Sequence, residues 1–197
     1  GKVNFDYYGV ADNEFGWWRI EGGKVNFDYY GIAENEYGWW KIEGGKVNFD
    51  YTGLADSDNG RMYVSNGGVD FGYTNVIQDG DVWVYVENGK VRYDYTGIRE
   101  NANGWWKIES GIVNFKFTGI ASNENGEFYI KDGKVDFDYS GTINQSDCIY
   151  TVKSGWVVSK EGISGIIKGV DVSHHNNDNG EGVLNWAEVA NAGYKFA

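Results

Sequence analysis

The chain has 197 residues, no proline, 30 glycines, one cysteine and 17% aromatic residues, a composition typical of a repetitive, β-rich protein. Its formal net charge of -12 argues against nucleic acid or an anionic lipid surface as a partner, because both require a basic surface. One cysteine excludes a disulfide framework within the chain, and the absence of an 18-residue apolar run argues against a membrane span. A neutral or cationic ligand fits this composition better.

A 22-residue repeat runs through most of the chain. Its marker is a valine followed two residues later by an aromatic residue, first at Val3 and Phe5 and last at Val135 and Phe137. Glycine-containing dipeptides such as Gly22-Gly23 separate the copies, and these pairs tolerate the positive φ angles of two-residue type I′ hairpin turns. We therefore predict an all-β solenoid of about seven stacked hairpins over residues 1–160, followed by a linker over 161–168.

A two-residue turn at Gly22-Gly23 fixes which residues of its hairpin face each other. Ile20 is then predicted to face Val25, Trp18 to face Phe27 and Trp17 to face Asp28. The segments GVADNEFG, GIAENEYG and GLADSDNG are predicted to be loops that carry the chain to the next hairpin. In each loop the first glycine is followed by an apolar residue, which is expected to pack between hairpins. Four such residues are Val10, Ile32, Ile98 and Ile120.

The dipeptide Trp17-Trp18 recurs at 39–40 and 105–106, although neighbouring side chains of a strand point to opposite faces. Every copy is apolar or aromatic at the Trp18 position, which predicts a core side chain. The Trp17 position tolerates Arg61 and Glu127, which predicts an outward side chain. The register places an aspartate opposite three of the outward tryptophans and Lys116 opposite the fourth. The candidate ligand-binding residues are Trp17, Asp28, Trp39, Asp50, Trp83, Asp94 and Trp105.

Two interpretations of these outward tryptophans stay open. An indole face beside a carboxylate suits a quaternary ammonium group through cation–π attraction, or a sugar ring that stacks on the indole. Alternatively, each tryptophan packs against the next hairpin and the aspartate accepts its indole N–H.

The pattern GWWKIEGGKVNFDYTG resembles the cell-wall-binding repeats of choline-binding proteins and their relatives in glucan-binding enzymes and clostridial toxins. The resemblance covers residues 1–160 and implies that aromatic residues of consecutive hairpins enclose the ligand. The period is longer than is usual in those repeats. The resemblance therefore implies the architecture more directly than it implies choline as the ligand.

From Lys168 the sequence pattern changes. Residues 169–173 alternate like a strand, an apolar helical stripe follows, and residues 194–197 begin a second strand. The segments GVDVSHHN and NWAEVANAGYKFA resemble the first strand, helix and second strand of family 25 glycoside hydrolases, which are muramidases with an α/β-barrel fold. The resemblance implies that residues 169–197 are the truncated start of a catalytic domain, in which Asp171 is a catalytic carboxylate of the parent enzyme.

Glycoside hydrolysis needs two positioned carboxyl groups, so this chain is expected to be inactive on its own. The alternative for Asp171 is a strand-end carboxylate that only orders a loop. No cofactor is expected. No metal site is expected either, because His174 and His175 would point apart in an extended strand and DSDNG has its glycine one position too early for a calcium loop.

These features predict a module that binds wall glycans or choline-like groups through repeated weak sites and targets a secreted muramidase to the wall of a Gram-positive bacterium. Neither nucleic acid binding nor membrane insertion is expected, and the oligomeric state is left open. We also expect a piece of a longer protein, because residue 1 falls inside a predicted turn and no signal segment precedes it. The alternative functions are a host-glycan-binding adhesin or toxin-type repeat module, and a passive spacer.

Overall fold

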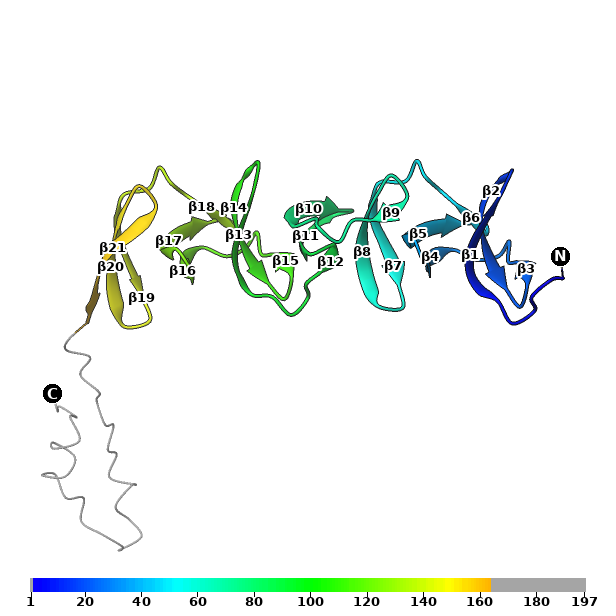
Figure 1. Ribbon diagram of the computed structural model, residues 1–197. Helices are drawn as coiled ribbons and strands as arrows, with labels where there is room; N and C mark the ends of the chain where they lie inside the picture. Colours follow the sequence, from blue (N-terminus) through cyan, green and yellow to red (C-terminus); the bar gives the residue numbers. More distant parts are fainter. Residues whose placement is uncertain (1, 164–197) are drawn as a thin grey trace, which may run out of the picture.

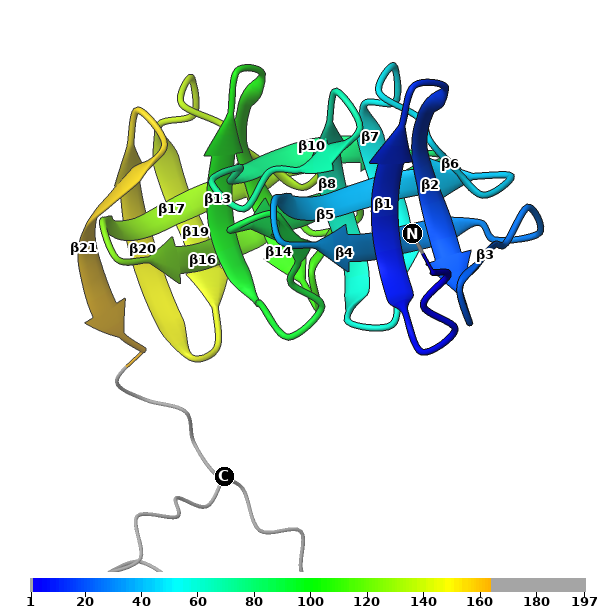
Figure 2. The same ribbon diagram turned by 45° about the vertical axis from the view of Figure 1, so that its right-hand side comes forward.

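The computed structural model describes residues 2–163, which form seven β-hairpins stacked in one row (Figure 1). Consecutive hairpins cross one another, so that upright and crosswise hairpins alternate along the row (Figure 2). The paired long strands are β1 (Tyr8–Asn13) and β2 (Gly16–Glu21), β4 (Gly31–Asn35) and β5 (Gly38–Glu43), β7 (Gly53–Ser57) and β8 (Gly60–Ser65), β10 (Asn75–Asp79) and β11 (Val82–Glu87), β13 (Gly97–Asn101) and β14 (Gly104–Glu109), β16 (Gly119–Asn123) and β17 (Gly126–Lys131), and β19 (Gly141–Gln145) and β20 (Cys148–Lys153).

A short strand follows each of the first six hairpins, and a longer one follows the seventh. The short strands are β3 (Lys24–Val25), β6 (Lys46–Val47), β9 (Gly68–Val69), β12 (Lys90–Val91), β15 (Ile112–Val113) and β18 (Lys134–Val135). The last strand, β21 (Trp156–Gly162), pairs with β20 along its length. Each repeat unit therefore consists of one hairpin and one added strand.

The predicted all-β class is confirmed for the repeat region, because residues 2–163 contain strands and turns but no helix. Accordingly, that part of the chain has no helix long and apolar enough to cross a membrane. The predicted β–α unit lies outside the described residues, together with Asp171, His174 and His175.

The hairpins form across a different turn from the predicted one. β1 pairs with β2 from Tyr8 opposite Glu21 to Asn13 opposite Gly16, so the tip is Glu14-Phe15. The segment GVADNEFG and its equivalents are therefore strands with a tight turn, and their prediction as loops was wrong. In β1 only Gly9 and Val10 are buried, and Asp12 and Asn13 toward the tip are polar and exposed, which gives the sequence of this strand the appearance of a loop.

The predicted glycine-containing turns are confirmed, but they join each hairpin to its added strand. Gly22 and Gly23 have φ angles of 56° and 73°, as a type I′ turn requires. The second position also lacks space for a side chain, since a Cβ on Gly45 would lie 2.3 Å from the Asn26 carbonyl oxygen. Ile20 pairs with Val25 as predicted, and β3 ends there.

The same turns attach each hairpin to the next one. The Arg19 N–H donates to the Gly45 carbonyl oxygen at 2.8 Å, and Trp18 pairs with Lys46 of β6. Apolar clusters fill the gaps between hairpins. The first joins Val10 to Ala33, Ile42 and Val47. The predicted packing between hairpins is confirmed by the low exposure of its four residues, none above 7%: Val10, Ile32, Ile98 and Ile120.

Candidate functional site

Trp17 and Trp18 are neighbours on β2, and only Trp17 joins an apolar cluster between hairpins. Trp17 packs against the first apolar cluster, between its own hairpin and the next. Trp18 lies 5.9 Å from Phe27, measured between ring centroids, and donates its indole N–H to Asn13 Oδ1 at 3.1 Å. Packing between hairpins is therefore observed for the Trp17 position. This packing leaves part of each tryptophan accessible to a ligand, because both side chains are only half-buried.

The Trp18 position is a core position where the residue is not tryptophan. Its smaller occupants are nearly or fully buried: Met62, Val84, Phe128 and Tyr150. Where the residue is tryptophan, as at Trp40 and Trp106, the side chain stays half-buried and joins an aromatic group. The prediction of a core residue is thus confirmed for four copies, whereas these tryptophans are partly open to solvent.

Three aromatic rings from consecutive repeat units meet at the first gap. Trp17 of β2 lies 5.0 Å from Trp40 of β5 and 5.9 Å from Phe49, in the turn after β6, and Trp40 lies 5.7 Å from Phe49. The interplanar angles are 66°, 82° and 67°, so the rings form the walls of a corner and not a stack. Tyr37, at the tip of the second hairpin, lies 5.9 Å from Trp17. We call the group of Trp17, Trp40 and Phe49 cage 1.

The same geometry recurs further along the row. Cage 2 consists of Trp83, Trp106 and Phe115, with centroid distances of 5.1, 6.2 and 5.7 Å. Cage 3 consists of Trp105, Phe128 and Phe137, in which Trp105 lies 5.2 and 5.8 Å from the other two rings. Each cage thus takes one ring from the Trp17 position of a hairpin and one from the Trp18 position of the next.

The remaining positions lack a three-ring cage among the described residues. Trp39 and Phe71 lie 5.7 Å apart, but Met62 stands where the third ring would be. In the third hairpin Arg61 replaces the first tryptophan, and its guanidinium donates to Asp79 Oδ1 at 2.7 Å and Asp56 Oδ1 at 2.8 Å. These hydrogen bonds raise the pKa of Arg61 above its ordinary value, so this position holds an internal cation.

The three cages are open to solvent on one side. Their phenylalanine walls, Phe49, Phe115 and Phe137, are 44, 43 and 40% exposed. A cation is attracted to an aromatic face when it lies within about 6 Å of the ring centroid. Since the rings meet at steep angles, a small cation in the corner of cage 1 or cage 2 can approach more than one face. In cage 3 Phe128 is fully buried, so only Trp105 and Phe137 remain for a ligand.

The residue paired with the Trp18 position differs from cage to cage. It is Gly68 opposite Trp40 in cage 1 and Lys134 opposite Trp106 in cage 2. The Lys134 Nζ lies 5.3 Å from the Trp106 centroid, so cage 2 already carries a cation on one wall. In cage 3, Trp156 pairs with Phe128 and its ring lies 4.5 Å away.

The predicted strand partners of the outward tryptophans were wrong. The strand partner of Trp17 is Asp12, because β1 and not β3 runs beside it, and the partner of Trp83 is Gln78. Asp28 is exposed in the turn after β3, where its N–H donates to Asn26 Oδ1. The other strand partners are Glu34 for Trp39 and Glu100 for Trp105, in place of the predicted Asp50 and Lys116.

Asp94 is held by Arg92. The two side chains are joined by hydrogen bonds of 2.9 Å, which lower the pKa of Asp94 to about 2. Its charge is therefore compensated locally. Among residues 2–163, no group of three or more histidine, cysteine or acidic side chains could hold a metal ion.

In each cage, the two aromatic residues that follow the first tryptophan in the chain were not predicted from the sequence. Their signal was present, because an aromatic residue follows the first tryptophan after 23 and again after 32 positions in all three cages. The missed residues are Trp40, Phe49, Trp106, Phe115, Phe128 and Phe137. Only the stacking of the hairpins, which crosses unit boundaries, turns that spacing into proximity.

The structure is a β-hairpin solenoid in which aromatic side chains of successive units meet at the unit boundaries. The sequence model of the choline-binding repeat matches six successive stretches that cover more than half of the chain: residues 6–26, 28–48, 50–70, 72–92, 94–114 and 116–136. The chain therefore belongs to the choline-binding repeat family. No curated protein matches it.

Membership of this family makes the chain a choline- or cell-wall-binding module of a kind typical of wall-associated proteins. The six matches end at residue 136 and give no support to the resemblance of residues 169–197 to a glycoside hydrolase.

Proposed function

We propose that cages 1, 2 and 3 each bind the quaternary ammonium group of choline on a bacterial cell-wall polymer, and so attach the protein to the wall. The observation that carries this proposal is the set of three-ring corners built from consecutive hairpins in a choline-binding repeat chain.

The chemistry of the cages favours a methylated ammonium. Trimethylammonium has no N–H to donate, so it needs aromatic faces and apolar contact more than hydrogen-bond acceptors. Lysine-like ammonium groups, in contrast, lose strong hydration when they enter such a site. The net charge of -12 also favours the approach of cationic groups over anionic ones.

Three cages on one row of hairpins support attachment by avidity. Each cage is small and partly open, which suits weak single contacts. When one choline group of a polymer is bound, the next is held at a high effective concentration near the remaining cages. Overall attachment is then much tighter than the binding of free choline.

The test is retention on purified choline-bearing cell walls. Trp17, Trp83 and Trp105 are replaced together by isoleucine, which stands at this position in the seventh hairpin as Ile149 and keeps an apolar contact with the core. We expect the triple variant to be lost from the walls, and free choline to release the wild-type protein. The matched control replaces Tyr8 and Tyr30, which are 66 and 70% exposed and belong to none of the three cages. Equal retention of the wild-type protein and the triple variant would rule out the proposal.

The aspartates have a weaker proposed role. Asp50 follows Phe49 of cage 1 and is exposed, so we propose that it attracts the cation at longer range. Asp28 follows Phe27, beside Trp18, and is proposed to act in the same way. Asp50→Asn should weaken choline binding slightly at low salt and not at high salt, when compared by titration.

The protein that this module carries to the wall is proposed to be a secreted muramidase of a Gram-positive bacterium. Support comes from residues 169–197 alone, where GVDVSHHN and NWAEVANAGYKFA resemble the start of a family 25 glycoside hydrolase with Asp171 as a catalytic carboxylate. The sequence of the gene beyond Ala197 tests this directly, because a muramidase requires further acidic residues on later strands.

A further inference from the structure

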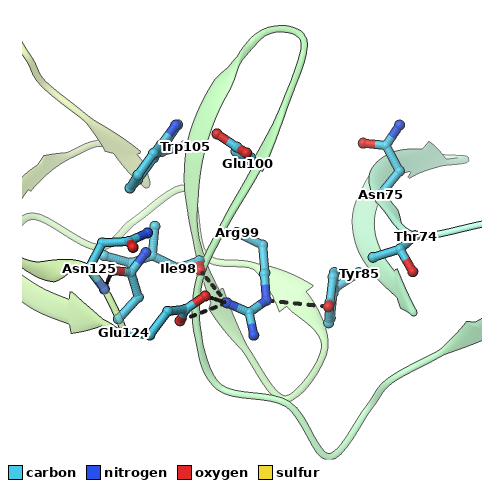
Figure 3. A pocket seen from close by; sticks show the side chains of 10 residues that line it. Thr74, Asn75, Tyr85, Ile98, Arg99, Glu100, Trp105, Glu124 and Asn125 are labelled. Atoms are coloured by element: carbon cyan, nitrogen blue, oxygen red, sulfur yellow. Dashed lines mark hydrogen bonds and ion pairs between the residues drawn. The ribbon is translucent and has the colours of Figure 1, made fainter. Parts of the chain in front are cut away.

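A polar cavity of about 310 Å³ lies between three consecutive hairpins and shares Trp105 with cage 3 (Figure 3). Thr74 and Asn75 line it from the fourth repeat unit, Arg99 and Glu100 from β13, and the tip of the sixth hairpin closes it with residues 123–125. Its volume is at the lower end of the range of small-molecule sites. The other walls of cage 3, Phe128 and Phe137, do not line it.

Arg99 is fixed at the centre of this cavity. Its guanidinium carbon lies 4.5 Å from the Tyr95 ring centroid, its Nε donates to the Tyr85 hydroxyl at 3.3 Å, and its Nη1 donates to Glu124 at 2.8 Å. Figure 3 shows the guanidinium between Tyr85 and Glu124, with Glu100 and Trp105 side by side above it. Among the described residues these bonds use Nε and Nη1, so the N–H groups of Nη2 are left for a ligand.

The lining combines donors, acceptors and one flat apolar face. Arg99 and the amides of the asparagines donate, whereas Glu100 and Glu124 accept. Arg99 and Glu124 compensate each other and Glu100 leaves one net negative charge, so an anionic ligand is disfavoured. A neutral ring with several hydroxyl groups can satisfy both kinds of partner and stack on the Trp105 indole.

The cavity recurs three repeats earlier with the same set of groups. That second cavity, of about 170 Å³, is lined by Glu34, Trp39 and Asp58 where the first has Glu100, Trp105 and Glu124. Position 33 is alanine there, but Arg19 enters from β2 and supplies the guanidinium in place of Arg99. An arginine thus lines both cavities, although it comes from a different sequence position in each.

From this arrangement we propose that the cavity of Arg99, Glu100 and Trp105 binds an uncharged sugar ring, as a site distinct from the ammonium cages. The array then contacts both the cationic group and the neighbouring carbohydrate of a wall polymer.

The fourth hairpin provides matched substitutions. Its equivalent groove has Ile77 and Gln78 where the cavity has Arg99 and Glu100, and it keeps the tryptophan as Trp83. Arg99→Ile and Glu100→Gln therefore install residues that this fold already accommodates.

The experiment titrates the isotope-labelled full chain with two uncharged sugars, the trisaccharide of N-acetylglucosamine and maltotriose, and follows the indole N–H signal of Trp105 by NMR. We expect at least one sugar to shift this signal together with the side-chain amide signals of Asn75, Asn123 and Asn125. Arg99→Ile should weaken that binding by about tenfold, as expected for the loss of a hydrogen bond to a charged group.

Two results would overturn the proposal: no shift at Trp105 with either sugar, or unchanged affinity in both variants. Tighter binding of a sugar phosphate than of the uncharged sugar would also contradict it. A parallel choline titration keeps the two proposals separate, since a failure of the cages leaves the sugar response intact and a failure of the cavity leaves the choline response intact.

Discussion

Trp39 and Trp40 are adjacent in sequence but pack in different gaps of the stack. Trp17 is a wall of cage 1, whereas Trp40, at the position of Trp18 one repeat later, is the facing wall of the same cage. The two tryptophans of such a pair therefore pack in the two gaps on either side of their hairpin. The pair at 105–106 shows this most clearly, because Trp105 contacts Phe128 of the following unit and Trp106 contacts Trp83 of the preceding one.

Lys134 should weaken cage 2. Its Nζ lies 5.3 Å from the Trp106 centroid, and a cation on this ring reduces the attraction for a second one. Lys134→Gly should tighten choline binding at cage 2 about two- to fivefold, which corresponds to a partly exposed cation–π contact. The shift of the Trp106 indole signal during a choline titration measures this effect.

The reverse substitution tests the same idea at cage 1. Gly68 occupies the equivalent position, and a Cβ there would make an ordinary contact with Trp40 at 3.4 Å. Gly68→Lys should therefore fold and weaken cage 1 by a similar factor. If neither substitution changes the affinity of its cage, the lysine does not compete with the ligand.

Asn101 should hold Trp106 in place. Its Oδ1 accepts the indole N–H of Trp106 at 2.9 Å, and its Nδ2 donates to the Val76 carbonyl oxygen of the preceding hairpin at 2.8 Å. Asn101→Ala leaves both partners unsatisfied and should lower the free energy of unfolding by about 1–3 kcal/mol in urea denaturation. Asn103→Ala, on the exposed tip of the same hairpin, is the control and should have little effect.

At the scale of the element, the glycine-containing turn both closes the added strand and joins neighbouring hairpins. Gly45 combines a φ of 77° with contact to the Asn26 carbonyl oxygen, and its own carbonyl oxygen accepts the N–H of Arg19. The first turn position is less demanding. Asparagine occupies it at Asn66 and Asn88 with φ angles of 49° and 52°.

Substitutions in this turn should therefore differ sharply. Gly45→Ala should destabilise the protein by more than about 1 kcal/mol, because both the backbone conformation and the space exclude a Cβ. Gly44→Asn should be nearly neutral. Thermal unfolding of the two variants measures the difference, and equal melting temperatures would show that the turn does not restrict its second residue.

The repeat and its turns were predictable from local sequence, since Gly22-Gly23 and its equivalents indicate a type I′ turn without reference to the rest of the fold. The tip at Glu14-Phe15 was not, because its charged and aromatic residues have no strong turn preference and β1 is buried only near its start. The wrong tip led to the wrong strand partner for Trp17. Cage walls such as Phe49 depend on how units stack, and the pattern of one repeat does not contain that information.

At the scale of the whole molecule, the hairpins form a single row in which cages 1, 2 and 3 occupy separate gaps (Figure 1). The third hairpin interrupts the series, since Arg61 and its two aspartates replace a cage by an internal ion pair. An array of this kind suits a polymer that carries many copies of a small cationic group, because every further cage raises the overall strength of attachment.

The central claim is that the cages, and not other exposed aromatic residues, bind choline. Isothermal titration calorimetry of the full chain with choline tests it most directly, with wild type compared against Trp17→Ile/Trp83→Ile/Trp105→Ile and against Tyr8→Ala/Tyr30→Ala. We predict saturable binding by the wild-type protein and by the tyrosine variant, and a loss of at least about tenfold in affinity for the tryptophan variant. Binding of unchanged affinity and stoichiometry in the tryptophan variant would contradict the account.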